Sequence, residues 1–493
     1  MMQHPLKKQI PALILLALVC PGISFATELT GIVTVDGKPR QGVVVSDGDN
    51  VVVTDSRGAY SMTSDGRQYV FVSVPSDCEL PLKNGRPAFY KAIDSSTPRA
   101  TANFELKGGD GVNDWTLIAL ADVQIGFKKD YTDLRDTVMP LMVDSMANYS
   151  GKVYGISLGD LVWNNPDFYG LYNEQIDRLG IPVLPVIGNH DHNEITKGDT
   201  ESDREYRDNL GPTYYSLNIG DCHIVALDNI IYSGEKNRND YRCGLTDSQL
   251  EWFKKDLEHV SKDKTLIVAM HSPTVRRNKP EYRMVNGDNF YDAVRPFADV
   301  QILSGHTHNN NTTLIADNIT DNTLGAVNGA FWYPICNDGS PQGYGVFHFS
   351  DGKLKDKYYK GFREPRNYQM RLYAPAEAVL WQPEAKAGDP YDKIAINIWS
   401  WDPRWKIEVC EDGKWRELDA KEAASGLPAR DPGLVALLTG KKGTFPANHA
   451  GSRPILNNTH IFLYKPADGW KTVSVRATDN FGNVYTSSLD NAE

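Results

Sequence analysis

The chain has 493 residues, too many for one hydrophobic core, so two to four domains are expected. Its hydrophobic content of 41% and charged content of 23% are those of an ordinary globular protein. The formal net charge of −11 argues against nucleic acid or an anionic membrane surface as the main partner, because proteins that bind polyanions are usually basic.

Residues 1–26 have the pattern of a signal peptide. Two lysines precede the apolar stretch 10–19, and Ser24 and Ala26 supply the small residues that a signal peptidase reads. The stretch is too short to cross a bilayer as a stable helix, so we expect no transmembrane segment in the mature chain. We predict cleavage after Ala26 and export, most simply to a bacterial periplasm. A lipid anchor at Cys20 is the alternative, disfavoured because the residue before it is not small.

Residues 27–109 are predicted to form an all-β domain. Short runs rich in β-branched residues recur at 31–35, 42–46, 51–54, 59–62 and 69–74, with turn-forming residues between them. Such short, regularly spaced strands are typical of a β-sandwich, here of immunoglobulin or transthyretin type.

In residues 110–362, strands alternate with helical segments, which predicts an α/β domain. The clearest helix is 246–260, where Thr246 and Gln249 form a capping box and apolar residues repeat on one face. A second helix is expected over 132–148, and Pro140 predicts a kink or a break within it.

Six apolar runs in this domain have the pattern of strands buried on both faces of a parallel sheet. They cover 115–121, 153–158, 183–187, 224–227, 266–270 and 300–304. Parallel strands end at the same edge of a sheet, so the polar residues that follow them should meet there. Five runs are followed by potential metal ligands or their neighbours: Asp122 and Gln124, Asp160, Asn189 with His190 and Asp191, His271, and His306 with His308. The sequence therefore predicts a dinuclear metal site at one sheet edge. The sixth run ends at Asp228, for which a structural role is expected.

Residues 363–493 are predicted to form a second β-sandwich of similar type. Strand patterns cover 394–399, 405–409, 459–464, 471–477 and 484–487, and no helix is expected beyond about residue 368. Neither flanking sequence carries a cluster of ligand residues, so packing and display are the expected roles of both domains.

Five of the six cysteines lie outside the signal peptide, and their spacing fits no zinc ribbon. A disulfide between Cys222 and Cys243 and free buried thiols are both compatible with the sequence.

The motif order resembles that of the calcineurin-like metallophosphoesterase superfamily, whose blocks are D-x-H, G-D, G-N-H-D/E, H and G-H-x-H. The corresponding blocks here, in the same order, are Asp122-Val123-Gln124, Gly159-Asp160, Gly188-Asn189-His190-Asp191, His271 and Gly305-His306-Thr307-His308. The flanking β domains look like those of an exported bacterial subfamily with a sandwich on each side of the enzyme. The resemblance implies a central αββα-type sandwich between two all-β domains.

The resemblance also implies two divalent metal ions, with manganese, zinc, iron and magnesium all admissible. Asp122, Asp160 and His308 would hold the first ion, with Gln124 where the family usually has histidine. Asp160, Asn189, His271 and His306 would hold the second ion. His190 would protonate the leaving oxygen, and Asp191 would orient its ring. A hydroxide between the ions would attack phosphorus in line with the leaving group.

Gln124 is the departure from the family pattern. It could ligate a harder ion such as manganese or magnesium, lie outside the coordination sphere and leave that ion loosely held, or mark a decayed site. The other six ligand positions are intact, which favours an active enzyme.

The expected function is therefore hydrolysis of a phosphate mono- or diester by an exported phosphoesterase. Phosphate-ester small molecules such as phosphosugars and nucleotides, and phospholipid or glycan head groups, are admissible substrates. Candidate substrate contacts are Asn164, Asn193, Arg276, Arg277 and Trp332, the arginines because a guanidinium can hold a phosphate. The alternative is a binding protein with a vestigial metal site, whose sandwiches recognise glycan or protein.

Overall fold

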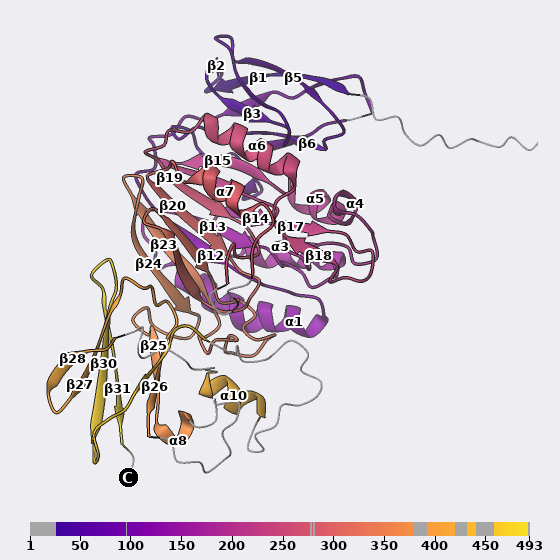
Figure 1. The fold of residues 1–493 in the computed structure, drawn as a ribbon. Helices are drawn as coiled ribbons and strands as arrows, with labels where there is room; N and C mark the ends of the chain where they lie inside the picture. The colour runs from indigo at the N-terminus through magenta and orange to yellow at the C-terminus, as the bar shows by residue number, and fades with distance from the viewer. Residues whose placement is uncertain are drawn as a thin grey trace, which may run out of the picture.

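The computed structural model describes residues 26–94, 96–276, 279, 282–378, 392–419, 431–439 and 458–491 (Figure 1). The apolar stretch of the signal peptide, Cys20 and Arg277 lie outside the described residues. Within the described part of the chain, no helix has both the length and the apolar character needed to cross a membrane.

The N-terminal region is all-β, as predicted. β1 (Thr27–Val35) alternates buried and exposed residues, so one face of its sheet packs inward. Its partners are β2 (Lys38–Pro39), β5 (Ala59–Ser64), β10 (Arg99–Thr101) and β11 (Phe104–Leu106). A second sheet has the order β4-β3-β6-β9 and consists of β3 (Val44–Ser46), β4 (Val51–Val53), β6 (Tyr69–Val72) and β9 (Tyr90–Ala92). The short strands β7 (Leu82–Lys83) and β8 (Arg86–Pro87) form a separate hairpin.

The central region contains two sheets rather than the one sheet that the strand pattern suggested. The first has the order β14-β13-β12-β23-β24, built from β12 (Asp114–Leu120), β13 (Lys152–Leu158), β14 (Val183–Val186), β23 (Gly343–Ser350) and β24 (Lys353–Gly361). The second has the order β15-β16-β19-β20-β22-β21, built from β15 (Tyr215–Ile219), β16 (Cys222–Ala226), β19 (Thr265–Ala269), β20 (Asp299–Ser304), β21 (Asn311–Ala316) and β22 (Ile319–Thr323). Three of the six predicted runs lie in each sheet, and within each sheet they are parallel.

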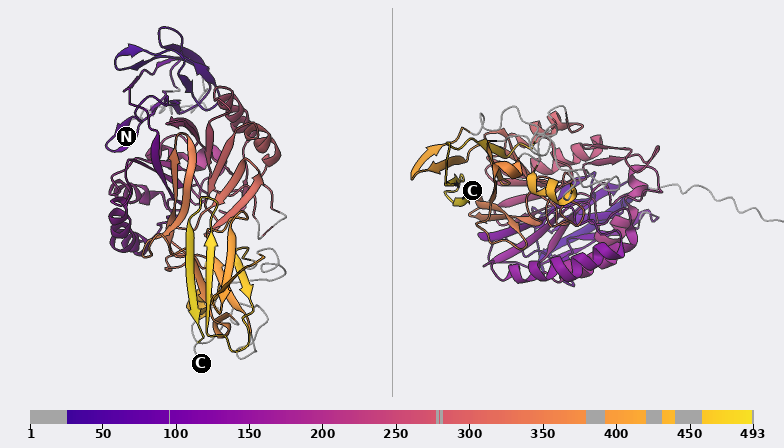
Figure 2. Two further views of the ribbon diagram at one scale, coloured as in Figure 1. Left: turned by 90° about the vertical axis from the view of Figure 1, so that its left-hand side faces the viewer. Right: turned by 90° about the horizontal axis from the view of Figure 1, so that it is seen from below.

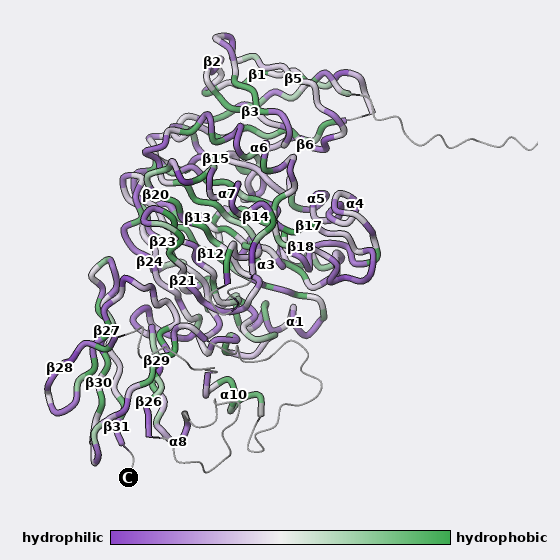
Figure 3. The backbone as a smooth tube through the Cα atoms, viewed as in Figure 1, coloured by the Kyte–Doolittle hydropathy of each residue, from purple (hydrophilic) through white to green (hydrophobic). Residues whose placement is uncertain are grey.

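The two sheets share one hydrophobic core, which contains Leu117 and Ile156 of the first sheet together with Ile267 and Ile302 of the second. Helices cover the outer faces, so the αββα layering is confirmed (Figure 2). The first sheet is covered by α1 (Lys128–Asp133), the π-helical turn η1 (Leu134–Val138), α2 (Met139–Met146) and α3 (Tyr169–Asp177), and the second by α6 (Asp247–Glu258) and α7 (Gly287–Val294). Figure 3 shows hydrophobic residues concentrated in these inner strands.

Two helix predictions can be compared in detail. Pro140 is the second residue of α2, which begins directly after the π-helical turn, so its missing backbone N–H lies in the first turn of the helix. Thr246 caps α6 as predicted, because its hydroxyl accepts from the backbone N–H of Gln249 at 3.2 Å. The other half of the predicted capping box, a hydrogen bond from the Thr246 backbone N–H to the Gln249 side chain, was wrong. The Gln249 carboxamide instead pairs with the backbone of Asp228 in both directions, at 2.7 and 3.0 Å.

Short elements connect the central strands. They are the 3₁₀ turn η2 (Pro166–Phe168), α4 (Asp199–Ser202), α5 (Arg204–Leu210) and the hairpin of β17 (Ile230–Tyr232) with β18 (Tyr241–Cys243). Cys222 and Cys243 are both free thiols, so the disulfide considered from the sequence is not formed.

The C-terminal region packs a three-stranded sheet of β25 (Met370–Tyr373), β26 (Ile394–Ile398) and β29 (Ile461–Tyr464) against a four-stranded one. The latter consists of β27 (Lys406–Glu411), β28 (Lys414–Glu417), β30 (Thr472–Thr478) and β31 (Val484–Asp490). The expectation that helices stop before this region was wrong, since α8 (Pro375–Ala378) and α10 (Pro432–Thr439) lie within it. Leu434 and Leu438 of α10 pack on Ala330 and Ile335 of the central region, a contact that a local pattern does not encode.

Candidate metal centre

The predicted ligand residues lie where the carboxyl ends of strands from the two sheets face each other. Asp160 follows β13, and His271 and His306 follow β19 and β20 of the other sheet. One potential ligand atom from each of these three residues lies within 4.8 Å of the other two. The two-sheet architecture therefore brings together residues that are more than a hundred positions apart.

His271 presents one ring nitrogen to this group. Its Nδ1 lies 2.8 Å from the backbone oxygen of Leu158, which can only accept, so Nδ1 carries the proton. The remaining nitrogen, Nε2, lies 3.2 Å from Asp160 Oδ2 and 3.1 Å from both Asn189 Oδ1 and His306 Nδ1. These four atoms belong to the four residues expected to hold the second ion, and their carboxylate, amide and imidazole chemistry fits a divalent cation.

A second group lies beside the first. His308 donates Nδ1–H to the backbone oxygen of Gly329 at 2.8 Å, and its Nε2 lies 3.4 Å from Asp122 Oδ1. Asp122 Oδ2 accepts from the backbone N–H of His306 at 2.8 Å, whereas Oδ1 is buried and accepts no hydrogen bond from the part of the chain that the structure describes. A buried carboxylate oxygen without a donor is costly unless a cation pairs with it. The residues therefore fit the first metal ion that the sequence motifs imply.

The motif glycines permit this close approach. A side chain at Gly305 would place its Cβ 2.4 Å from Asp122 Oδ2, and one at Gly188 would lie 2.4 Å from Asp160 Oδ1. A Cβ at Gly159 would lie 2.5 Å from His271 Nδ1. These separations are below van der Waals contact, so the three positions admit only glycine without rearrangement.

The backbone is strained where it carries the candidate ligands. Five of them have a φ angle between 49° and 69°, in the left-handed region that residues with side chains rarely adopt: Asp122, Gln124, Asp160, His306 and His308. Each such residue raises the energy of the fold by about 1–3 kcal/mol. This concentration of strain at strand ends is typical of a functional site.

Gln124 is 2% exposed and lies beside Asp160. Its Nε2 donates to Asp160 Oδ2 at 2.8 Å, and its Oε1 accepts from Asn328 Nδ2 at 2.7 Å. The carboxamide oxygen thus faces Asn328 rather than the other candidate ligands. This geometry favours the interpretation in which Gln124 lies outside the coordination sphere. Asn328 carries no motif signal, and sequence reasoning missed it.

The structure corrects the assignment of Asp191. Its carboxylate accepts hydrogen bonds from the backbone N–H groups of Leu161, Val162 and Gly188 at 2.8 to 3.1 Å, so it braces the loop that carries Asp160. Among the described residues, no hydrogen bond joins the Asp191 carboxylate to the His190 ring. That ring is held instead by Asn164, whose Oδ1 lies 2.9 Å from His190 Nδ1 and whose N–H donates to the His190 carbonyl at 2.9 Å.

Aromatic rings line one side of the centre. Trp163 stacks on His190 at 4.7 Å, and Phe331 stacks on His308 at 5.0 Å while meeting Trp163 edge-on. Trp332 follows Phe331 and is half-buried, and its buried Nε1–H has no hydrogen-bond partner within the described residues. Tyr241 lies edge-on to His306 at 6.3 Å, and no sequence motif indicates its presence there.

The candidate substrate contacts separate into two groups. Asn164 lies at the centre, and Arg276 is near enough that its charge contributes to lowering the pKa of His306. Arg276 Nε is buried and has no hydrogen-bond partner among the described residues, which suits an anionic ligand. Asn193 does not join them, because its carboxamide donates to Glu205 at 2.7 Å and accepts from the backbone of Ile195.

The electrostatics couple Asp160 to the imidazoles. Burial alone would raise the pKa of Asp160, but attraction to His271 and His190 outweighs it and holds that pKa well below the usual range. Burial would lower the pKa of His271, yet the Asp160 carboxylate raises it to about 10. Burial and the charge on His271 hold the pKa of His306 well below its usual value. Without a metal ion, Asp160 and His271 thus form an ion pair.

Comparisons with known proteins agree with this arrangement. Residues 118–310 match the family model of the calcineurin-like phosphoesterases, residues 27–109 match the model described as the N terminal of calcineurin-like phosphoesterase, and residues 322–485 match that of its C terminal. The probable glycerophosphodiester phosphodiesterase GpdQ of Arcobacter nitrofigilis is 26% identical over 166 residues. That match covers 32% of this chain and 58% of the relative's length.

Two solved structures are also similar. A dimetal phosphatase from Danio rerio is 13% identical with a TM-score of 0.36, and the match covers 51% of this chain and 97% of that one. A 5'-nucleotidase from Candida albicans is 14% identical with a TM-score of 0.33, and the match covers 51% of this chain and 52% of that one. The three family models match consecutive parts of the chain from residue 27 to residue 485, and the chain belongs to the calcineurin-like metallophosphoesterase superfamily.

Proposed function

We propose that the protein is an exported, metal-dependent phosphoesterase that hydrolyses a phosphate mono- or diester. The observation that carries the proposal is the convergence of Asp160, His271 and His306, with Asp122 and His308 beside them. The signal-peptide pattern of residues 1–26 supports export.

In this proposal Asp160 lies between two groups of ligands, with Asp122 and His308 on one side and His271 and His306 on the other. When bound, two divalent ions would supply Lewis acidity to the phosphoryl oxygens and lower the pKa of a water molecule. Gln124 would hold the Asp160 carboxylate in place through its Nε2–H group.

The remaining roles fall to groups that face the substrate. Asn164 accepts from His190 Nδ1, so the proton that this ring would give to the leaving oxygen is carried on Nε2. Arg276, with its unpartnered Nε–H, would bind a phosphoryl oxygen. The half-buried wall of Trp163, Phe331 and Trp332 would contact the ester group that leaves.

The name of the relative from Arcobacter nitrofigilis makes a glycerophosphodiester the first substrate to test. Phosphosugars, nucleotides and other phospholipid or glycan head groups follow it, because the ligand residues do not distinguish mono- from diesters.

The test is hydrolysis of an aryl phosphate, a bis-aryl phosphate and a glycerophosphodiester by protein reconstituted with manganese, zinc, iron or magnesium after chelation. We expect at least one ester to turn over, and Asp160→Asn to lose both activity and bound metal. Asp167→Asn is the matched control, because this exposed aspartate lies in the same loop region outside the centre. Tight metal binding without turnover of any ester would refute the proposal and favour a binding protein.

A further inference from the structure

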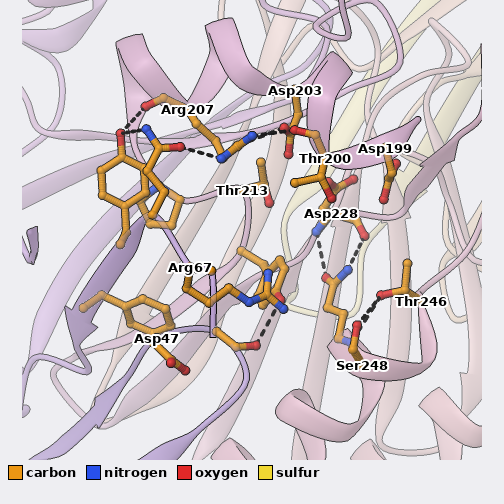
Figure 4. Close-up of a pocket in the computed structure, with 18 residues that line it drawn as sticks. Asp47, Arg67, Asp199, Thr200, Asp203, Arg207, Thr213, Asp228, Thr246 and Ser248 are labelled. Atoms are coloured by element: carbon orange, nitrogen blue, oxygen red, sulfur yellow. Dashed lines mark hydrogen bonds and ion pairs between the residues drawn. The ribbon is translucent and has the colours of Figure 1, made fainter. Parts of the chain in front are cut away.

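A cavity of about 190 Å³ lies between the N-terminal region and the central region, and none of the candidate metal ligands lines it (Figure 4). One side comes from the N-terminal region, with Arg67 and Phe71. The other comes from the segment around α4 and α5, from Thr213 and Tyr214, and from the loop after β16. Thr200 and Ser248 in the lining are exposed, so the cavity opens to solvent.

Three aspartates of the central region line this cavity, and each has one oxygen engaged with the protein. Asp199 Oδ1 accepts from the Tyr232 N–H at 2.7 Å, Asp203 Oδ1 from Arg207 at 2.8 Å, and Asp228 Oδ1 from the Ile230 N–H at 3.1 Å. The second carboxylate oxygen of each receives no hydrogen bond from the described residues. Three acceptors therefore remain available to a ligand.

Thr213 provides an independent indication of a ligand. It is 7% exposed, and its hydroxyl makes no hydrogen bond within the described part of the chain. Figure 4 shows that hydroxyl directed into the space between Arg67 and Asp228. Although the residue is largely buried, its hydroxyl is free to form a hydrogen bond with a molecule bound in the cavity.

The charges around the cavity do not balance. Arg67 is paired with both carboxylate oxygens of Asp49, and Arg207 is occupied by Asp203, Gln68 and the Thr200 carbonyl. Asp199 and Asp228 consequently have no cationic partner among the described residues. Burial raises the pKa of Asp199 to about 6 and that of Asp203 to about 7, and burial with the charges of these two raises the pKa of Asp228 well above its usual value. A bound cation would favour the ionised form of each carboxyl group.

The spacing of the acids selects the kind of cation. Oxygens that share one metal ion lie within about 5 Å of one another, since each metal–oxygen bond is about 2.4 Å long. Among the described His, Cys, Asp and Glu residues, only Asp160, His271 and His306 form a group of three whose ligand atoms lie within 4.8 Å of one another. The three cavity aspartates do not, so a single ion cannot bind all of them directly. A cation with several separated N–H donors fits better.

The lining also has an apolar part, since Phe71 and the ring of Tyr214 contribute to it. We propose that the cavity binds a small aliphatic diamine, with one ammonium group on Asp228 and the other on Asp199 and Asp203. Thr213 accepts a further N–H hydrogen bond, and the methylene chain lies against the aromatic rings. This site does not depend on the proposed phosphoesterase activity.

Calorimetric titration of the full chain with 1,4-diaminobutane tests the site. We expect saturable binding of one diamine per chain and no binding of 1,4-butanediol, which has the same length without charge. Asp228→Asn should weaken binding at least tenfold. Glu201→Gln removes an exposed acid from α4, the helix that also carries Asp199, and should leave the affinity unchanged.

Thr213→Val provides a second variant that removes only the hydroxyl, and circular dichroism verifies the folding of each variant. We expect Thr213→Val to weaken diamine binding several-fold. Absence of saturable binding to the unmodified chain would overturn the proposal. The proposal would also be overturned if Asp228→Asn and Thr213→Val both bound the diamine as tightly as the unmodified chain does, or if the cavity bound calcium ions in place of the diamine.

Discussion

Replacing Asp191 with asparagine tests whether this residue braces the Asp160 loop or acts through His190. The side chain is 1% exposed, and its carboxylate accepts from three backbone N–H groups. In Asp191→Asn, an amide NH₂ takes the place of Oδ2 and faces the Gly188 N–H at what is now a 2.8 Å hydrogen bond. Two buried donors would then oppose each other, at a cost of about 1–3 kcal/mol.

Two other effects change the free-energy cost of this substitution. The bonds from Leu161 and Val162 lose their charge assistance, which removes about 1 kcal/mol each. Relief of repulsion from Asp160 offsets part of the loss, since burial and that repulsion together raise the pKa of Asp191 to about 7. We therefore expect the loop to lose about 3 kcal/mol of local stability, which corresponds to roughly 100-fold faster amide exchange at 1.4 kcal/mol per factor of ten.

Hydrogen exchange of the Leu161, Val162 and Gly188 amides measures this directly, because opening of the loop sets their exchange rate. Metal content should fall in the same variant, since the braced loop carries Asp160. Asp167→Asn serves as the exposed control and should exchange like the unmodified chain. Unchanged protection of the three amides, combined with an altered pH–rate profile, would show that Asp191 acts on His190 and that the bracing interpretation is wrong.

Four further predictions concern the centre. Gln124→His should change the preferred metal, measured by elemental analysis and activity with each ion, while turnover persists; an inert variant with full metal occupancy would contradict a role at the metal site. His190→Ala should retain metal and lose about 10²–10⁴-fold in rate, and loss of metal instead would reassign this residue to the ligand set. Metal affinity should rise with pH, because the ion must displace the proton that Asp160 stabilises on His271. For the same reason the metal-free protein should lose thermal stability as pH increases from 6.5 through about 10, since His271 contributes most when protonated. Competition titrations and melting curves across this range check both signs, and an affinity that falls with pH would refute the ion pair.

The sequence by itself determined the positions of these strands along the chain and the chemistry of the loops that follow them. Short runs of Val, Ile and Leu that stop at Asp122, Asp160 or His271 are local features, because burial of a strand and exposure of its end are both written in neighbouring residues. The glycines of the motifs are local features too, since their role is to let one backbone approach a carboxylate or an imidazole.

Only the tertiary structure decided which strands belong to which of the two sheets and that the centre lies where the sheets meet. It also decided that Asn164 holds His190 while Asp191 braces a loop, that Gln249 binds the backbone of Asp228, and that Asn328 contacts Gln124. The physical reason is the same in each case. A buried donor or acceptor binds whichever partner remains free after the backbone has paired, and that partner is brought near by packing between segments distant in the chain.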